Sequence, residues 1–383
     1  MGDLEVLGPA APRGHLLGDV VRATLRDGSA EVTDARAEPT GYAFTSIATG
    51  GLFRVRGTAA TGSGNRCWSV FTKVLQHPRH WPLIDVIPPH AAAEIKELFP
   101  WRDELDTREQ VLPVLPSGLR VPDIYRVVDL GDDRLAVWME DIDADDDPWD
   151  DEAYARAAYL LARLAARRTP GTAAGATALA PGLAVRKLVE SRGVLVPGPL
   201  DDDALWARPE VADAVDDDYR ADLRRTLGMI PALLAEMDTL PAAMPHGDAA
   251  PVNLLRPRDE PGSYVAIDWA FQCHLPLGHD LGQLLVGEVE RGRMDPVRLP
   301  VLLDVTLAAY VDGLAEEGLD LSAHTVLRGA LCSSLAPRTL PFAFPIEHLD
   351  DPVPDDGYLR RRAGLGRWIL DLALGAGCQV RRE

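Results

Sequence analysis

The chain has 383 residues, with 39 Lys or Arg against 59 Asp or Glu, so its formal net charge at pH 7 is −20. Nucleic acid repels such a charge, and we expect none as a partner. The length suggests two domains or lobes, and no apolar stretch approaches the length of a membrane span.

Four cysteines, Cys67, Cys273, Cys332 and Cys378, show no paired spacing. This argues against a disulfide framework and fits a reducing compartment. The start of the chain has no basic segment followed by an apolar run, so it predicts no signal peptide. We therefore expect a cytoplasmic protein that does not associate with membranes.

The strand signals lie in the first part of the chain. In chain order, the predicted elements are a short helix at 14–26, strands at 53–58 and 67–75, a helix at 91–115 and a hairpin at 124–140. The strands are bounded by Gly-, Ser- and Asp-rich turns, which is the pattern of β-hairpins.

From residue 141 onward, apolar residues recur at helical spacing, so this part is predicted to be mainly helical. The predicted helices are 152–168, 216–240, 299–314, 322–335 and 359–374. The Ala-, Gly- and Thr-rich segment 169–181 is predicted to be a loop.

Polar residues that are suited to catalysis lie close together in one segment, Pro245 to Leu255. It reads Pro-His-Gly-Asp-Ala-Ala-Pro-Val-Asn-Leu-Leu. A second carboxylate, Asp268, ends an apolar run beyond it. Asp248 can accept the proton of a hydroxyl group, and oxygens of Asn253 and Asp268 suit Mg²⁺. Phosphoryl transfer needs these parts, because its chemistry is mostly positioning and charge neutralisation. A lone Asp is more often a turn or cap residue, so the prediction depends on the whole motif.

This segment resembles the catalytic loop and metal-binding segment of the aminoglycoside phosphotransferase family, small-molecule relatives of the protein kinases. The matching residues are His246, Gly247, Asp248, Asn253 and the triplet Ile267-Asp268-Trp269. The resemblance implies that Asp248 is the catalytic base and that Asn253 and Asp268 bind Mg²⁺. It also implies that His246 orders the catalytic loop by hydrogen bonding.

Two departures from the protein kinases favour the small-molecule branch. Ala250 stands where those kinases usually have a Lys, and Trp269-Ala270 follows the metal-binding Asp where they have Phe-Gly. Asp280 matches a residue of the family that supports the catalytic loop structurally.

The resemblance implies an α+β, bilobal protein-kinase-like fold. We expect a small β-rich N-terminal lobe that binds the nucleotide, residues 1–141, and a larger, mainly helical C-terminal lobe with the catalytic loop and the acceptor site, residues 142–383. The segment Trp138 to Ile142 is the expected hinge.

Lys73 ends an apolar strand and can reach the phosphates of a nucleotide as a point charge. The alternative is an ordinary Lys at a strand edge. Glu104 is the carboxylate expected to pair with Lys73, although Glu94, Glu97 and Glu109 are competitors. Glu104 could instead pair with Arg108 within its own helix.

Two further segments are predicted to contact the nucleotide. Gly50 and Gly51, within Thr45 to Leu52, could let backbone amides approach the phosphates, although a plain turn fits this segment nearly as well. Backbone groups at Met139, Glu140 and Asp141 are expected to bind adenine, as the resemblance implies.

The sequence therefore predicts a phosphotransferase that moves the γ-phosphate of ATP, or of another nucleotide such as GTP, with Mg²⁺, to a hydroxyl group. The expected acceptor is a small, sugar-containing metabolite or antibiotic. A kinase acting on Ser or Thr of a peptide, and a non-catalytic binding module of the same fold, are the alternatives. The acidic runs 141–152, 201–203, 216–218 and 350–356 either attract a cationic acceptor or form a solvated surface.

Overall fold

The computed structural model of the protein describes residues 4–40, 46–192, 197–269, 272–345, 355 and 357–379. The chain forms two compact units. The first contains Met1–Asp106 and Val121–Asp143, and the second contains Thr107–Arg120 and Ala144–Glu383.

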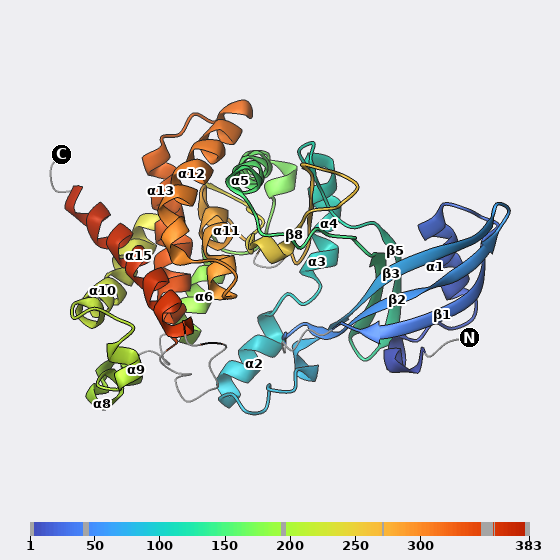
Figure 1. Cartoon of the computed structure of the whole chain (residues 1–383), viewed down its shortest axis with the longest axis horizontal. Helices are drawn as coiled ribbons and strands as arrows, with labels where there is room; N and C mark the ends of the chain where they lie inside the picture. Colours follow the sequence, from blue (N-terminus) through green and yellow to red (C-terminus); the bar gives the residue numbers. More distant parts are fainter. Residues whose placement is uncertain are drawn as a thin grey trace. The chain divides into compact units, whose positions relative to one another are not determined.

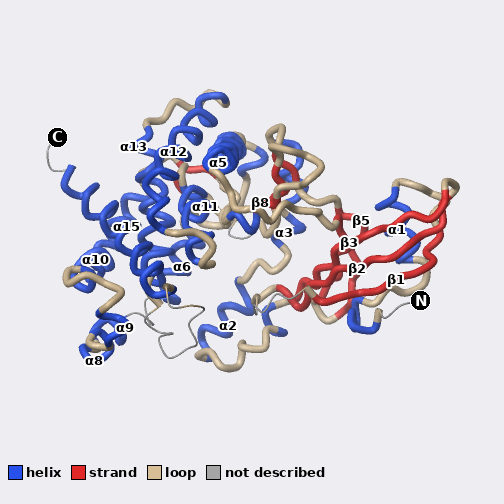
Figure 2. The backbone as a smooth tube through the Cα atoms, viewed as in Figure 1, coloured by secondary structure: helices blue, strands red, loops and turns tan. Residues whose placement is uncertain are grey.

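The first unit is built on an antiparallel five-stranded sheet with the order β1-β2-β3-β6-β5 (Figures 1 and 2). Its strands are β1 (Glu31–Pro39), β2 (Thr49–Thr61), β3 (Gly64–Gln76), β5 (Ile124–Gly131) and β6 (Arg134–Glu140). The predicted hairpin is the β5–β6 pair. Its two central turn residues, Asp132 and Asp133, have φ of 55° and 52°, as a tight hairpin turn requires.

Apolar side chains cover both faces of this sheet. On one face, Val55, Val70 and Trp138 pack with Val20 and Val21 of helix α1 (Leu16–Leu25). The 3₁₀ helix η1 (Glu5–Ala10) contributes to the same core. On the other face, a smaller cluster is formed by Leu75, Val137 and Met139 with partly buried residues of the segment that follows β3.

In this part of the chain one strand was missed and the prediction of one helix was wrong. Strand β1 was not predicted, because only Ala35 and Ala37 along it are buried and the segment shows little apolar alternation. The predicted helix 91–115 is broken at Pro100, since Phe99 before the proline is extended. Its pieces are α2 (Pro89–Leu98), α3 (Asp103–Asp106), α4 (Arg108–Val111) and η3 (Leu112–Val114). The 3₁₀ helix η2 (Pro78–His80) lies before them in the chain.

The second unit is mainly helical, as predicted. Its longer helices are α5 (Asp151–Ala166), α6 (Leu183–Arg192), α10 (Tyr219–Met237), α11 (His279–Glu290), α12 (Leu299–Glu316), α13 (Ala323–Ala330), the π-helix η7 (Leu331–Thr339) and α15 (Tyr358–Gln379). The short ones are η4 (Ala173–Gly175), α7 (Pro197–Asp201), α8 (Asp203–Trp206), α9 (Pro209–Ala212), η5 (Pro251–Asn253), η6 (Pro296–Arg298) and α14 (Leu340–Ala343). Helix α11 is buried along almost its whole length, so it forms the centre of this unit.

Two small sheets in the second unit position the motif residues. One has the order β4-β9-β8, with β4 (Leu119–Arg120), β9 (Tyr264–Ala266) and β8 (Leu254–Leu255), and the other pairs β7 (Ala242–Ala243) with β10 (Leu275–Pro276). Strands of two or three residues give no periodic signal, so the sequence did not predict them.

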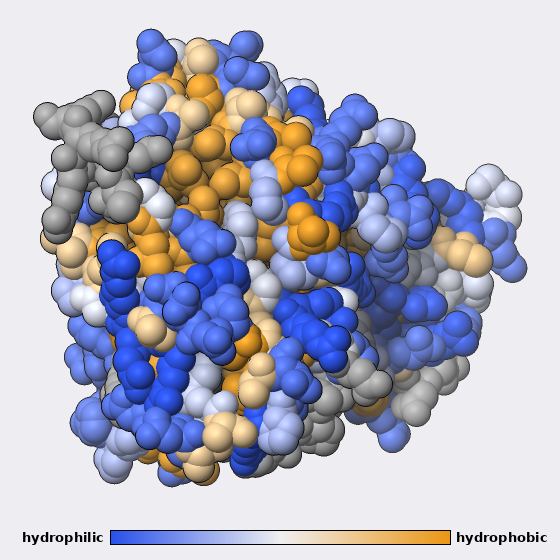
Figure 3. All heavy atoms as spheres, turned by 60° about the vertical axis from the view of Figure 1, so that its left-hand side comes forward, coloured by the Kyte–Doolittle hydropathy of each residue, from blue (hydrophilic) through white to orange (hydrophobic). Residues whose placement is uncertain are grey.

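The surface carries both polar and apolar side chains, and Figure 3 shows one face on which apolar side chains gather among hydrophilic ones. Val297 and Val301 are among the exposed large apolar residues. Scattered apolar exposure is normal for folded proteins and identifies no partner. None of the helices in the described ranges is long and apolar enough to cross a membrane.

Candidate active site

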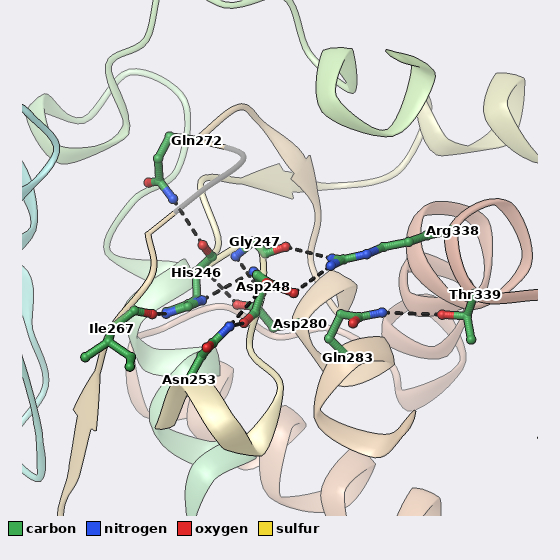
Figure 4. A network of polar contacts seen from close by, with 10 residues as sticks. All are labelled: His246, Gly247, Asp248, Asn253, Ile267, Gln272, Asp280, Gln283, Arg338 and Thr339. Carbon is green, nitrogen blue, oxygen red and sulfur yellow. Dashed lines mark hydrogen bonds and ion pairs between the residues drawn. The ribbon is translucent and has the colours of Figure 1, made fainter. Parts of the chain in front are cut away.

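The predicted catalytic loop lies between β7 and η5. One carboxylate accepts hydrogen bonds from its backbone (Figure 4). Asp280, in the first turn of α11, accepts hydrogen bonds from the backbone N–H groups of His246 and Gly247, each at 2.9 Å. Burial raises the pKa of the Asp280 carboxyl, and the two amide donors oppose this shift. Asp280 thus supports the loop without facing solvent.

His246 is completely buried, and both of its ring nitrogens have partners. Nε2 lies 3.0 Å from the carbonyl oxygen of Ile267, and Nδ1 accepts the backbone N–H of Asp248 at 3.3 Å. Burial lowers the pKa of His246, which favours the neutral ring that this hydrogen-bonding pattern requires. His246 therefore joins the loop to the segment that ends in Asp268, in agreement with an ordering role rather than that of a base.

The side chains of Asp248 and Asn253 are hydrogen-bonded to each other. Nδ2 of Asn253 donates to the backbone oxygen of Asp248 at 2.9 Å and to its Oδ2 at 3.2 Å. The Asp248 side chain is 23% exposed, so it is partly open to solvent. With its nitrogen used in this way, the Asn253 amide can offer Oδ1 to a cation.

Asp268 follows the strand that pairs with β8. The backbone N–H of Ile267 donates to the carbonyl oxygen of Asn253 at 3.0 Å, so the two proposed metal ligands lie on adjoining segments. Asp268 itself is exposed and has φ of 59°, a left-handed conformation that non-glycine residues seldom adopt. Such a conformation persists only where the surroundings impose it.

These residues suit Mg²⁺, because an exposed carboxylate and an amide oxygen are hard ligands and leave other positions to phosphate and water. Within the described residues, no group of three or more His, Cys, Asp or Glu side chains is arranged to hold a metal ion.

A buried arginine that the sequence did not single out supports the same loop. Arg168 donates to the backbone oxygens of Met244 and Pro245 at 3.2 and 3.1 Å and to Oε1 of Gln272 at 2.8 Å. Nε2 of Gln272 in turn donates to the backbone oxygen of His246. Burial lowers the pKa of Arg168 to about 10, with Asp280 opposing the shift. The sequence places Arg168 at the end of an ordinary helix and gives no sign of this role.

A second arginine, Arg338 of η7, contacts the proposed base directly. Its Nη2 lies 2.5 Å from Oδ1 of Asp248, and its Nη1 donates to the backbone oxygen of Gly247 at 3.0 Å (Figure 4). Ninety residues separate it from Asp248 in the chain, so no local pattern could have identified it.

In the first unit, the expected pairing of Lys73 with Glu104 is present. Nζ of Lys73, in β3, lies 2.5 Å from Oε2 of Glu104, and the two side chains are only 12% and 21% exposed. Glu104 belongs to α3, a helix of four residues, instead of the long helix expected. The contact of this pair with a nucleotide phosphate remains a prediction.

The other predicted nucleotide contacts also lie in the first unit. Gly50 and Gly51 are part of strand β2, at an irregularity in its pairing with β3, and do not form a separate loop before the strand; Thr45 lies outside the described residues. Met139 and Glu140 end β6. The Asp141 carboxylate accepts hydrogen bonds from Arg54 Nε, at 2.9 Å, and from the Ser69 hydroxyl, so this side chain has a structural function.

The acidic runs take part in ion pairs with arginines. Asp145 pairs with Arg256, Asp151 with Arg298, Asp201 with Arg224, Asp203 with Arg220, Asp216 with Arg367 and Asp355 with Arg361. Where the structure describes the runs, these pairs partly neutralise their charge, which favours the interpretation of a solvated surface over that of a cation-binding cleft.

Comparisons with known proteins identify the fold. No protein-family model matches the chain, and no curated protein matches it in sequence. An aminoglycoside phosphotransferase from Alicyclobacillus acidocaldarius subsp. acidocaldarius DSM 446 matches in structure with a TM-score of 0.51 at 14% identity, over 98% of this chain and 100% of that one. A candidate aminoglycoside phosphotransferase from Ralstonia eutropha JMP134 matches with a TM-score of 0.51 at 12% identity, over 94% and 98% of the two chains.

The protein therefore has an α+β fold like that of the aminoglycoside phosphotransferases, as predicted. At these identities the likeness establishes the fold and leaves the substrate open.

His279 is a buried titratable group beside the loop, and we expect its protonation to make the stability of the fold depend on pH. Its buried ring lies with Nδ1 2.9 Å from Oγ of Ser333, and burial, helped by Arg338, lowers its pKa from 6.5 to about 3. In the unfolded chain the ring binds a proton as the pH falls below its ordinary pKa, whereas the folded ring does so only near its lowered value. The stability present above the unfolded pKa is therefore lost as pH falls towards the folded pKa.

We expect His279→Gln to lose less stability than the wild type between about pH 7 and about pH 5, since the variant lacks the group whose proton binding favours unfolding. Urea unfolding at both pH values measures this. His324, which is exposed, provides the matched control His324→Gln. Equal losses in the wild type and His279→Gln would show that His279 does not control this pH dependence.

Proposed function

We propose that this protein is a phosphotransferase that moves the γ-phosphoryl group of ATP, or of another nucleoside triphosphate, to a hydroxyl group of a small molecule. The observation that supports this most is the hydrogen-bonded arrangement of Asp248 and Asn253 beside Asp268, on a loop whose backbone is held by Asp280. The shared fold with aminoglycoside phosphotransferases supports the same class of reaction.

In this reaction the acceptor oxygen forms a bond to the γ-phosphorus while the bond from that phosphorus to the bridging oxygen breaks, and the nucleoside diphosphate leaves. Asp248 accepts the proton that the acceptor hydroxyl loses. Mg²⁺, held through Asn253 and Asp268, would neutralise charge on the phosphates. In the first unit, the ion pair with Glu104 positions the ammonium group of Lys73 to contact a phosphate.

A nucleotide-consumption screen tests this function. The protein, Mg²⁺ and ATP or GTP are incubated with neutral sugars, amino sugars and hydroxylated antibiotics, and products are analysed by mass spectrometry for one added phosphate. We expect a phosphorylated small molecule whose formation stops in excess chelator.

Comparing cationic with neutral acceptors at low and high salt reports whether the acidic runs attract the acceptor, because screening weakens attraction between exposed charges. Phosphorylation of peptides alone would contradict the small-molecule assignment.

A further inference from the structure

We propose that Arg338 is a positioning residue for the catalytic base: it fixes the Asp248 carboxylate and supplies the positive charge that the catalytic loop itself lacks. This inference rests on the proposed phosphotransferase function. From His246 to Leu255 the sequence contains no Lys or Arg, and Ala250 occupies the position two residues after the base. The guanidinium of Arg338 lies against the base instead, and it comes from η7.

The guanidinium group of Arg338 is rigid and contacts the loop at two points. Nη1 donates to the backbone oxygen of Gly247 and Nη2 to the carboxylate of Asp248, so one planar guanidinium binds two successive residues. A planar fork with fixed donors sets direction as well as distance, whereas an ammonium group acts as a point charge. Arg338 is only 14% exposed, which limits competition from water.

The two oxygens of Asp248 have different partners. Oδ1 contacts Arg338, and Oδ2 contacts the amide of Asn253. A carboxylate held at both oxygens by separate elements has one defined orientation. Catalysis depends on such definition, because displacement of a reacting group by about 1 Å can cost about a hundredfold in rate.

The loop backbone is held without Arg338. Asp280 accepts the N–H groups of His246 and Gly247, Gln272 donates to the oxygen of His246, and Asn253 donates to the oxygen of Asp248. Removal of the Arg338 side chain therefore leaves the loop anchored. Its particular contribution is the orientation and charge environment of the Asp248 side chain.

The same helix that holds the loop also places Arg338. Ser333 and Thr339 of η7 hydrogen-bond His279 and Gln283 of α11 (Figure 4 draws the second contact). The two helices meet closely at Gly282, where an added Cβ would lie 2.1 Å from Oγ of Ser334. Since Asp280 lies in the first turn of α11, one helix fixes both the position of the loop and the position of the arginine.

The π-helical form of η7 is consistent with a functional requirement. Pro337, next to Arg338, has no backbone N–H, and the turn that contains it is wider than an α-helical one. Short π-helical segments occur frequently at functional sites. Here the segment places the guanidinium group of Arg338 against the carboxylate of Asp248.

The test compares Arg338→Ala and Arg338→Lys with a matched control, Arg328→Lys. Arg328 lies on α13, is 8% exposed and also pairs with a carboxylate, that of Glu236, which is not part of the loop. Hydrolysis of Mg-ATP with water as acceptor is measured for each variant, together with Mg-ADP affinity by calorimetry. Guanidinium chloride at a low, non-denaturing concentration is then added back.

We expect Arg338→Ala to lower the hydrolysis rate by about 10- to 100-fold with unchanged Mg-ADP affinity, and guanidinium to restore part of the rate. Arg338→Lys should lose less than Arg338→Ala, because a point charge remains. Arg328→Lys should be less stable than the wild type but should keep the wild-type hydrolysis rate. Added guanidinium should not change that rate. A wild-type rate in Arg338→Ala, or a reduced rate that guanidinium fails to raise, would overturn the proposal.

Crystal structures of the wild type and Arg338→Ala give a readout that does not depend on activity. We expect the Asp248 carboxylate to leave its position when Arg338 is removed, and an unmoved carboxylate would overturn the inference. A wild-type protein that neither binds nor hydrolyses nucleotide would contradict the proposed function, and the two crystal structures would still decide whether Arg338 positions Asp248.

Discussion

Asp248→Asn is expected to lower phosphotransferase turnover by about two to four orders of magnitude, the range that loss of a general base produces. The substitution keeps the shape of the side chain and removes its capacity to accept a proton. The loop should stay folded, because Asp280 and Gln272 hold its backbone and Asn253 still donates to the backbone oxygen of residue 248. The protein should therefore stay folded, with a Mg-ADP affinity close to that of the wild type.

The measurement is single-turnover transfer to an acceptor found in the screen, with calorimetry for Mg-ADP. Asp259→Asn provides the matched control, since Asp259 is exposed and the same chemical change there should leave turnover unaltered. If Asp248→Asn retains wild-type turnover with every acceptor, Asp248 is not the base.

The candidate site could be proposed from the sequence because the residues of its motif are close together. Asp248 and Asn253 are five residues apart, and their hydrogen bond is a local one. The hairpin β5–β6 and the long helices were also predictable, since their patterns of apolar residues and turns are regular. These signals require only neighbouring residues to specify structure.

The supporting parts of the site could not be predicted, because they come from distant segments. Arg338 contacts Asp248 across 90 residues, and Arg168 contacts Gln272 across 104. Each is an ordinary arginine in a helical segment until the fold brings it to the loop. The strands that align Asn253 with Asp268 are two and three residues long, too short for a periodic pattern. Tertiary contacts, which the sequence alone does not display, determine these features.

Asp268→Asn is expected to abolish the part of nucleotide binding that depends on metal, with a loss in Mg-ATP affinity of more than about a hundredfold. Even residues that act behind a metal ligand commonly contribute about 10- to 100-fold in metal affinity. Asn is the better test than Ala, because Asn tolerates the left-handed backbone that Asp268 adopts, whereas Ala adds strain at φ of 59°. The substitution thus removes the charge and keeps the local conformation.

Asn253→Ala should reduce the metal-dependent affinity less than Asp268→Asn, because a neutral amide attracts the cation less strongly than a carboxylate does. It should nevertheless lower turnover, since the amide of Asn253 also holds Oδ2 of Asp248. Calorimetric titration with ATP, with and without Mg²⁺, separates the two effects from turnover. Full transfer activity in excess chelator would contradict the metal site. Metal-dependent affinity that survives Asp268→Asn undiminished would also remove Asp268 from it, because a cation held mainly by its carboxylate cannot bind normally once that charge is gone.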